Sequence, residues 1–353
     1  MNIAGLGLIG APGRGLAALE LALERGWVPP VEVEVKGSPS GRLPVYAVTP
    51  ETLTDKSVLA KARRADRFTR MSVLAASDAL LDSGLAAGLD KNRLGVIVAT
   101  ALGPHATTFS FLDGILDFGD GAVSPTAFSH SVHNAAASYI AMTLEARGPT
   151  LTVTHFHFAF HQAVQIAGSW LAEGRCDAVL VGATDELGAV MQQVCSRMAT
   201  PAADGRIKPF ACSAQPECVP GEGSVFFLLT RETAGRAYGH LAVGDEAAGE
   251  SIRILDACGM AKDETAYRAV ALAGTLMASY APLFGSLFTG TVFHVAAAAL
   301  MVKQGKRYAS PVLDNPHGFP ICRETVSTPV ESVRCFRLDC SGQVAAVTVT
   351  AAP

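Results

Sequence analysis

Three imidazoles lie close together in the middle of the chain, at His155, His157 and His161. The surrounding stretch, THFHFAF, follows the apolar run GPTLTV and precedes an alanine-rich run that ends in LAEG. This order predicts a corner at which a strand turns into a helix. Such corners can present a nucleophile at the start of the helix, but neither serine nor cysteine occurs between Thr154 and Ser169. What the corner does is therefore the first question that the sequence raises.

The histidines of this corner are compatible with a metal site or with buried structural roles. His155 and His157 share a face if the segment is extended, and His161 follows His157 by four residues if the helix has begun. A metal site needs three or four converging ligands, with bonds of about 2.0–2.1 Å to nitrogen, and no carboxylate stands at helical spacing nearby. Histidines that bond to the backbone or to a partner chain are therefore favoured, and we expect no metal and no cofactor.

Short β-branched runs alternate with helical patterns through much of the chain. The runs are NIAGLGLI, LGVIVATAL, LTVTHF and CDAVLVGAT, and helical patterns occur in RMSVLAASDALLDSG and from Phe160 to Gly174. Such alternation favours parallel strands with helices on both faces of the sheet, an α/β fold. The apolar stripe of the second helix predicts a core position, and the glycine marks its end.

The same patterns divide the chain into two halves of similar organisation. A charged link, RETAGR, places a boundary near residue 235, so we expect one half at 1–235 and a shorter one at 236–353. Helices are predicted at about 263–280 and 291–304, before a terminal pair of strands, CFRLDC and VAAVTVT. The similar order suggests an internal duplication, although no residue-level repeat is visible.

The composition excludes several functional classes. The 353 residues can bury a substantial core, and 49% of them are hydrophobic. Only 17% are charged, against roughly 25% in typical soluble chains, which suggests that a partner subunit or thick layering covers much of the surface. The net charge of −4 and the lack of a long basic run argue against nucleic acids and anionic membranes as partners.

Other charged and reactive side chains are given structural roles. The arginines at 63, 64, 67 and 70 are interpreted as a solvated helix face rather than a patch for an acidic partner. The eight cysteines form no CxxC pair and lie mostly in apolar runs, which indicates unpaired thiols in a reducing cytoplasm. The first residues, MNIAGLGLIGAP, lack a basic segment, so we expect a buried strand rather than an export signal.

Several phrases, taken in order, resemble the β-ketoacyl synthases of the thiolase-like superfamily. MSVLAASDALLDSGL is similar to the helix after the family's arginine-bearing segment, and PTAFSHSVHNAAASYIAMTLEARGPTLTV to its interface segment and the lead into its nucleophile strand. DAVLVGATDE and PFACSAQPECVPGEGSVFFLL are similar to the strands that follow. The resemblance covers most of residues 70–230 and implies a thiolase-like fold, with two pseudo-symmetric halves in αβαβα layers.

This resemblance implies that all four catalytic positions of the family are substituted here. Counting from Gly148 puts His157 where the family has its nucleophilic cysteine. DACGMAKDE puts Cys258 at the first catalytic histidine, and SLFTGTVFHVAAAAL puts Ser286 at the lysine and Thr291 at the second histidine. Because an acyl-imidazole is labile in water, a histidine is a poor replacement for the nucleophile. Ordinary condensation is therefore expected to be lost.

A retained scaffold without catalytic groups resembles a chain length factor, the inactive ketosynthase-like partner of a working ketosynthase in type II polyketide and aryl polyene systems. This implies a heterodimer with a ketosynthase subunit, or a homodimer, that meets an acyl carrier protein. Such a partner can close the far end of the acyl tunnel. For the phenylalanines of the corner, ordinary core packing is the alternative. The candidate tunnel and interface residues are Phe128, His133, Asn134, Phe156, Phe158 and Phe160.

Two other functions stay open. Cys258, near Asp263, is a candidate for a relocated nucleophile with His157 as its general base, which would give acyl transfer or thioester hydrolysis. Alternatively, the chain is a homodimeric scaffold that pairs through the strand at 151–154. His294 is interpreted as a core or interface histidine rather than a substitute for a catalytic imidazole.

Overall fold

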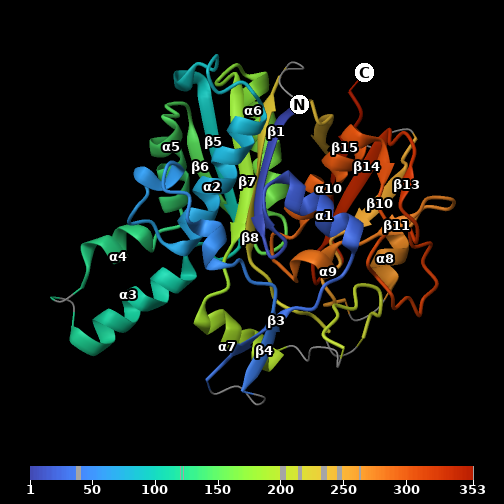
Figure 1. Ribbon diagram of the computed structural model, residues 1–353, viewed down its shortest axis with the longest axis horizontal. Coiled ribbons are helices and arrows are strands. Elements are labelled where there is room, and N and C mark those ends of the chain that lie inside the picture. The colour runs from blue at the N-terminus through green and yellow to red at the C-terminus, as the bar shows by residue number, and fades with distance from the viewer. Residues whose placement is uncertain are drawn as a thin grey trace.

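The computed structural model places two five-stranded units edge to edge around a pair of central helices (Figure 1). The boundary predicted near residue 235 and the start of the helix predicted at Asp263 lie outside the described residues. The described residues are 1–36, 41–119, 121, 123–198, 204–213, 217–231, 237–244, 249–261 and 264–352.

The first unit contains five strands in the spatial order β6-β5-β7-β8-β1. Strands β5, β6 and β7 are parallel to one another, whereas β8 is antiparallel to both β7 and β1. These strands are β1 (Asn2–Gly10), β5 (Leu94–Thr100), β6 (Thr150–Thr154), β7 (Ala178–Asp185) and β8 (Gly223–Thr230).

The second unit repeats this arrangement in the order β11-β10-β14-β15-β9, with the same pattern of directions. The two units meet where Asn2 of β1 pairs with His240 of β9. The predicted α/β fold with two pseudo-symmetric halves is confirmed by this topology. The strands are β9 (His240–Val243), β10 (Ile252–Leu255), β11 (Met277–Ala278), β14 (Ser332–Leu338) and β15 (Val344–Thr350).

Shorter strands complete the β-structure outside the two units. β2 (Gly13–Arg14) pairs with the end of β1, β3 (Val31–Glu34) pairs with β4 (Arg42–Val45), and β12 (Lys306–Arg307) pairs with β13 (Val326–Ser327). The α-helices are α1 (Leu16–Arg25), α2 (Arg67–Asp82), α3 (His105–Phe118), α4 (Pro125–His130), α5 (Ala135–Leu144), α6 (Ala159–Ala172), α7 (Ala189–Met198), α8 (Thr265–Val270), α9 (Ala281–Phe284) and α10 (Thr291–Gln304).

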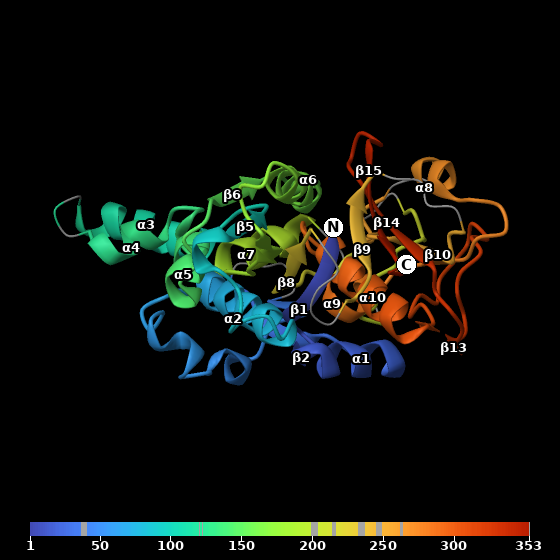
Figure 2. The same cartoon turned by 90° about the horizontal axis from the view of Figure 1, so that it is seen from above.

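The central helices α6 and α10 lie in the middle layer, between the two units (Figure 2). The apolar stripe of α6, including Phe160, Val164 and Trp170, is buried as predicted, and Gly174 ends this helix with a φ of +68°. The helix predicted at 291–304 is confirmed as α10. A single apolar core joins both helices to the inner faces of both units, so the halves share one interior.

The outer layers of the two halves differ. Helices α2 and α5 cover the outer face of the first unit with a second apolar core. The outer face of the second unit is covered by α8 and by irregular segments that contribute Phe210, Val312 and Phe319. The helix predicted at 263–280 is wrong, because α8 ends at Val270 and the chain turns into β11, which pairs with β10. Sheet pairing overrides the helical propensity of this alanine-rich segment.

Helices α3 and α4 form a hairpin that projects from the body beyond β6, the last strand of the first unit (Figures 1 and 2). Their exposed apolar side chains include Leu116, Phe118 and Phe128. Within the described residues, no helix has both the length and the apolar character needed to cross a membrane.

Candidate functional site

The corner predicted from THFHFAF is a turn at residues 156–158 that joins β6 to α6. The side chain of His155 supports this turn, because its Nδ1 accepts hydrogen bonds from the backbone N–H groups of His157 and Phe158, each at 3.1 Å. His155 therefore satisfies backbone donors ahead of the helix, as a capping side chain does.

The other two histidines of the corner are uncharged at neutral pH. Burial and the nearby charge of Arg337 lower the pKa of His157. His161 is buried, and burial lowers its pKa to about 4. Within the described residues, no group of three or more histidine, cysteine or acidic side chains is arranged to hold a metal ion. The three histidines thus have different surroundings rather than one shared ligand.

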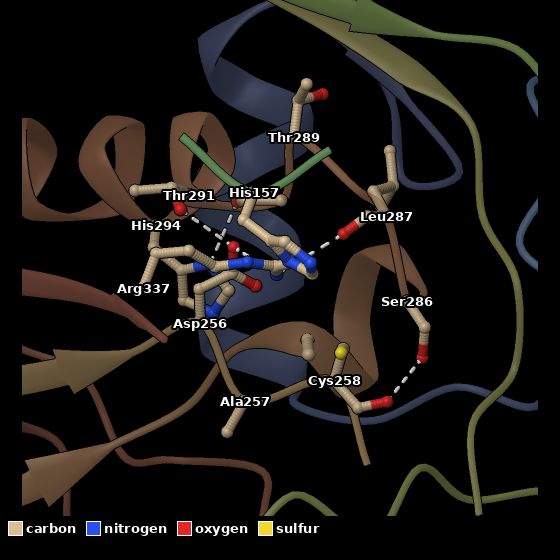
Figure 3. Close-up of polar contacts among 12 residues, drawn as sticks. His157, Asp256, Ala257, Cys258, Ser286, Leu287, Thr289, Thr291, His294 and Arg337 are labelled. Carbon is tan, nitrogen blue, oxygen red and sulfur yellow. Dashed lines mark hydrogen bonds and ion pairs between the residues drawn. The ribbon is translucent and has the colours of Figure 1, made fainter. Parts of the chain in front are cut away.

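An ion pair that the sequence analysis did not predict occupies the centre of the site (Figure 3). Arg337 Nη1, from β14, donates to Asp256 Oδ2, directly after β10, at 2.8 Å. The side chains of Arg337 and Asp256 are 4% and 2% exposed. Burial alone would lower the pKa of Arg337, but the charge of Asp256 reverses the effect and raises it. One signal was present in the sequence, because an arginine stands between Phe336 and Leu338 in an apolar strand.

The four positions implied to be catalytic all lie around this ion pair (Figure 3). Thr291, the first residue of α10, donates from Oγ1 to Asp256 Oδ2 at 2.8 Å. Ser286 Oγ donates to the carbonyl oxygen of Cys258 at 2.8 Å, so that hydroxyl is engaged with the backbone. The charge of Arg337 acts on the pKa of both His157 and Cys258. The structure therefore brings these substituted positions together.

The thiol of Cys258 is not activated in this environment. Burial raises its pKa, and the opposing effect of Arg337 is smaller. A raised pKa leaves less of the nucleophilic thiolate at neutral pH. Among the described residues, no hydrogen bond joins Cys258 to His157.

His294 is a core histidine, as predicted. Its side chain is buried, its Nε2 accepts the backbone N–H of Tyr280 at 3.1 Å, and its Nδ1 lies 3.0 Å from the carbonyl oxygen of Gly290. Because both ring nitrogens are bonded to the backbone, His294 is not available to a substrate.

The three phenylalanines of the corner have separate environments. Phe160 is 2% exposed and packs on Phe227 in the shared core, which is the core packing given as the alternative, and its place in a tunnel or interface stays a prediction. Phe158 stacks on His155. Phe156 is 54% exposed and contacts Phe288. Of these three side chains, Phe156 is the one that reaches the surface most fully.

The predicted interface segment lies beside β6. Phe128 is exposed on α4 and contacts Phe111 of α3. His133 and Asn134 precede α5 and line a hollow of about 480 Å³ together with Leu151 of β6. These residues therefore lie on one side of the molecule, at the free edge of the first unit.

A second buried polar cluster lies at the end of β7. Asp185 Oδ1 accepts the backbone N–H of Ala101 at 3.1 Å and the hydroxyl of Thr100 at 3.3 Å. Its Oδ2 accepts the backbone N–H and the hydroxyl of Thr289, each at 2.8 Å. This carboxylate ties the ends of two strands to the turn before α10.

One of the four clustered arginines also has a buried partner. Arg67, the first residue of α2, forms an ion pair with Glu222, whose side chain is 3% exposed. The prediction of a solvated helix face is therefore wrong for Arg67, while Arg63 and Arg64 are exposed.

A layered α/β fold of two repeated five-stranded units, with a strand-to-helix corner at its centre, defines the thiolase-like class. The family model described as "Beta-ketoacyl synthase, N-terminal domain" matches residues 41–234, which is more than half of the chain. The chain belongs to the β-ketoacyl synthase family.

The curated relatives include several polyketide β-ketoacyl synthases. The chain is 29% identical over 192 residues to putative polyketide beta-ketoacyl synthase 1 of Streptomyces halstedii, an alignment of 50% of this chain and 45% of that protein. It is 27% identical over 199 residues to oxytetracycline polyketide putative beta-ketoacyl synthase 1 of Streptomyces rimosus, covering 52% and 47%. The chain thus spans about half the length of the curated relatives it matches.

Solved structures share the fold over the whole chain. The ishigamide ketosynthase/chain length factor superposes with a TM-score of 0.80 at 16% identity, covering 100% of this chain and 99% of that one. A β-ketoacyl synthase from Burkholderia phymatum STM815 gives a TM-score of 0.78 at 16% identity, with coverage of 100% and 99%. The structure of a type II polyketide synthase acyl carrier protein in complex with its ketosynthase gives a TM-score of 0.80 at 15% identity. The match covers 99% of this chain and 99% of that one.

Proposed function

We propose that this chain is a non-catalytic ketosynthase-like subunit of the chain length factor type. In this proposal it pairs with an active β-ketoacyl synthase and shapes the acyl tunnel during polyketide or fatty-acid-like chain elongation. The observation that carries the proposal is the buried ion pair of Arg337 and Asp256, which lies among the positions that the family resemblance assigns to catalysis.

Loss of condensation follows from the side chains at these positions. His157 is a poor store for an acyl group because an acyl-imidazole hydrolyses readily. Thr291 offers a hydroxyl, which already donates to Asp256, and Ser286 donates to the backbone. Neither hydroxyl can accept a proton from a thiol near neutral pH as an imidazole can.

The free edge of the first unit supports pairing with another subunit. β6 pairs with β5 on one side, and its other edge is at the end of the sheet. An unprotected edge strand is a ready surface for a further strand. Exposed apolar side chains also lie on the projecting α3–α4 hairpin, with Leu116 at 82% and Phe118 at 75% exposure. Large exposed apolar side chains gathered on one element are a feature of protein interfaces.

The nature of the partners is part of the proposal. A ketosynthase subunit would cover β6 and the α3–α4 hairpin, and an acyl carrier protein would deliver the chain to that subunit. The solved complex of an acyl carrier protein with its ketosynthase supports this choice through the shared fold. A homodimer through the same edge is the alternative assembly, because a two-fold axis beside β6 would pair the strand with its own copy.

Co-expression with a ketosynthase encoded beside this gene tests the assignment. We expect native mass spectrometry to give a one-to-one heterodimer, and we expect the chain alone to leave malonyl-loaded acyl carrier protein unchanged. Phe128→Ala should weaken the dimer, whereas Leu81→Ala, at a similarly exposed leucine of α2, should not. Turnover of malonyl-loaded acyl carrier protein by the isolated chain would refute the non-catalytic role. A stable homodimer that excludes the ketosynthase would favour the alternative of a homodimeric scaffold protein.

Restoring the nucleophile alone should not restore condensation. In His157→Cys, the new thiol would face the charge of Arg337 and would lack both imidazoles of the family. We expect no product from malonyl-loaded carrier protein with this variant. An active synthase from that single change would show that positions 258 and 291 have been misassigned.

The alternative enzyme, with Cys258 as nucleophile, has less support. Burial raises the pKa of its thiol, so iodoacetamide should label Cys258 more slowly than the exposed Cys340. Selective labelling of Cys258, measured by peptide mass spectrometry, would instead favour acyl transfer or thioester hydrolysis.

A further inference from the structure

Three side-chain hydrogen bonds attach the start of α3, and with it the projecting α3–α4 hairpin, to the body of the molecule (Figure 1). In each of these bonds the acceptor is a titratable side chain. The pairs are the backbone N–H of Ala106 with Glu186 Oε1 at 2.8 Å, the hydroxyl of Thr107 with Asp66 Oδ2 at 2.8 Å, and the backbone N–H of Gly188 with His105 Nε2 at 3.1 Å. The attachment of the hairpin therefore depends on which acceptors carry a proton.

Two of these acceptors, Glu186 and His105, are buried against each other. Glu186 Oε1 lies 3.8 Å from His105 Nδ1, and the side chains are 2% and 7% exposed. Because Nε2 of His105 accepts a hydrogen bond, the neutral ring carries its proton on Nδ1. Burial raises the pKa of Glu186 to about 8 and lowers the pKa of His105 below its ordinary value of 6.5. Near pH 7 both side chains are therefore uncharged.

The charged groups around Glu186 add to the effect of burial. The negative charges of Asp66 and Glu222 also raise its pKa, whereas the N–H of Ala106 and the charge of Arg67 lower it. Arg67 is already paired with Glu222. An ionised Glu186 would therefore be a buried anion without a cation of its own, which is strongly unfavourable.

A change of protonation at either group would remove one point of attachment. When Glu186 loses its proton above about pH 8, moving its side chain toward water relieves the buried charge but breaks the bond to Ala106. When His105 gains a proton on Nε2 at acidic pH, the ring can no longer accept the N–H of Gly188. The contribution of Glu186 is thus lost as the pH rises through its raised pKa, and that of His105 as the pH falls through its lowered pKa.

We propose that Glu186 and His105 form a proton-sensitive anchor for the α3–α4 hairpin, which is closed while Glu186 is protonated and His105 is neutral. The anchor opens on both sides of that pH range. This device goes beyond the proposed pairing with a ketosynthase, and its test needs no partner. Because the hairpin carries the exposed side chains of Leu116 and Phe118, the anchor controls how this apolar surface is held against the body.

Hydrogen–deuterium exchange of the full chain tests the anchor. Exchange is read by mass spectrometry between pH 5 and pH 9, and each value is corrected for the intrinsic exchange rate at that pH. We expect the protection of the α3 amides to be greatest near pH 7 and to fall toward both ends. Because one proton is released from Glu186, protection should fall by up to about tenfold per pH unit above pH 8. The amides of α6 should keep their protection throughout.

Two variants separate the two sides of this profile. Glu186→Gln keeps an oxygen for Ala106 and cannot ionise, so it should abolish the loss above pH 8 and retain the acidic loss. His105→Gln keeps an acceptor for Gly188 without a titratable ring, and should abolish the acidic loss alone. Asp113→Asn, at an exposed carboxyl group of α3, is the control and should retain both losses. If one variant does not fold, the other still tests its own side.

Three outcomes would overturn the proposal. Constant protection of α3 from pH 5 to pH 9 would mean that the hairpin does not respond to protons. Equal losses in α3 and α6 would show that the whole chain responds rather than the hairpin. An alkaline loss that persists in Glu186→Gln, or an acidic loss that persists in His105→Gln, would assign that side of the profile to another group.

Discussion

The ends of β7 and β14 occupy equivalent places in the two halves but carry opposite charges. Ala183 pairs with Ala99 in the first unit, and Cys335 pairs with Ile254 in the second, with all four residues in the shared core. Two residues further along each strand stand Asp185 and Arg337. The repeated topology thus places a carboxylate and a guanidinium at matching positions.

The hydrogen-bonding groups of Asp185 and Arg337 are used to different degrees. Asp185 accepts four hydrogen bonds, two of them from backbone N–H groups. Arg337 is paired with Asp256 through one nitrogen, while its Nε has no partner among the described residues. The first cluster is closed and holds strands and helix together. In the second cluster the Nε of Arg337 is unbonded within the described residues, so equivalent places in the two halves hold one fully bonded carboxylate and one partly bonded guanidinium.

The largest effect is expected when Asp256 is left without its cation. Arg337→Met should lower the free energy of unfolding by about 3–5 kcal/mol, because an unpaired carboxylate would remain buried. Urea denaturation followed by circular dichroism measures this loss. Adding Asp256→Leu should recover most of it. If the double variant were as unstable as the single one, the ion pair would not be the cause.

Removing the carboxylate of the closed cluster should come next. Asp185→Ala strands the N–H groups of Ala101 and Thr289, so we expect a loss of about 2–4 kcal/mol in the same assay. Asp185→Asn keeps one acceptor oxygen and should lose about half as much. Equal losses in the two variants would mean that the hydrogen bonds of Asp185 contribute little.

A smaller, pH-dependent change in the free energy of unfolding is expected from Glu186, the residue after Asp185. Burial raises the pKa of Glu186 to about 8, from an ordinary value of 4.5. The folded state therefore holds a proton that the unfolded chain releases above pH 4.5, and this contribution to stability is lost as the pH rises through about 8. Glu186→Gln should be about 1–2 kcal/mol more stable than the original chain at pH 8, and similar to it at pH 5.

The matching position in the second half provides the control for this prediction. Leu338 follows Arg337 and has no proton to exchange, so Leu338→Met should leave the pH dependence unchanged. Unfolding curves at pH 5, 6.5 and 8 compare the three proteins. An unaltered slope in Glu186→Gln would assign the pH dependence to other groups.

The smallest effects should come from the two threonines before and at the start of α10. Thr289→Val and Thr291→Val each remove one hydroxyl donor from a buried carboxylate while keeping the shape of the side chain. Each should lower the free energy of unfolding by about 1 kcal/mol. If one variant lost more than twice as much unfolding free energy as the other, the hydroxyl would matter more in that cluster, either that of Asp185 with Thr289 or that of Asp256 with Thr291.

The repeated elements of the fold were predictable because their signals are local. The apolar stripe of α6 and the apolar runs of β5 and β7 follow from side-chain periodicity alone. The segment after Val270 was predicted as helix because its alanines and leucines favour one. It instead supplies β11, and that choice depends on pairing with β10, which no local pattern reports.

The candidate site was predictable in its location but not in its content. Family resemblance directed attention to His157, Cys258 and Thr291, which do surround one centre (Figure 3). The ion pair at that centre joins residues 81 positions apart, so neither partner signals the other along the chain. Strand alternation does place Arg337 on the same face as Cys335, and a charged residue on an inward face is the signal to search for.

The interior shared by the halves limits how this chain can be divided or altered. Helix α6 packs on strands of its own unit and on β9 and β15 of the other, and α10 reaches β8 in return. A fragment that ended between the halves would expose one side of each central helix to water. The backbone of the corner between β6 and α6 is therefore held in place by packing from both halves. Its side chains can be substituted more easily than its backbone course can change.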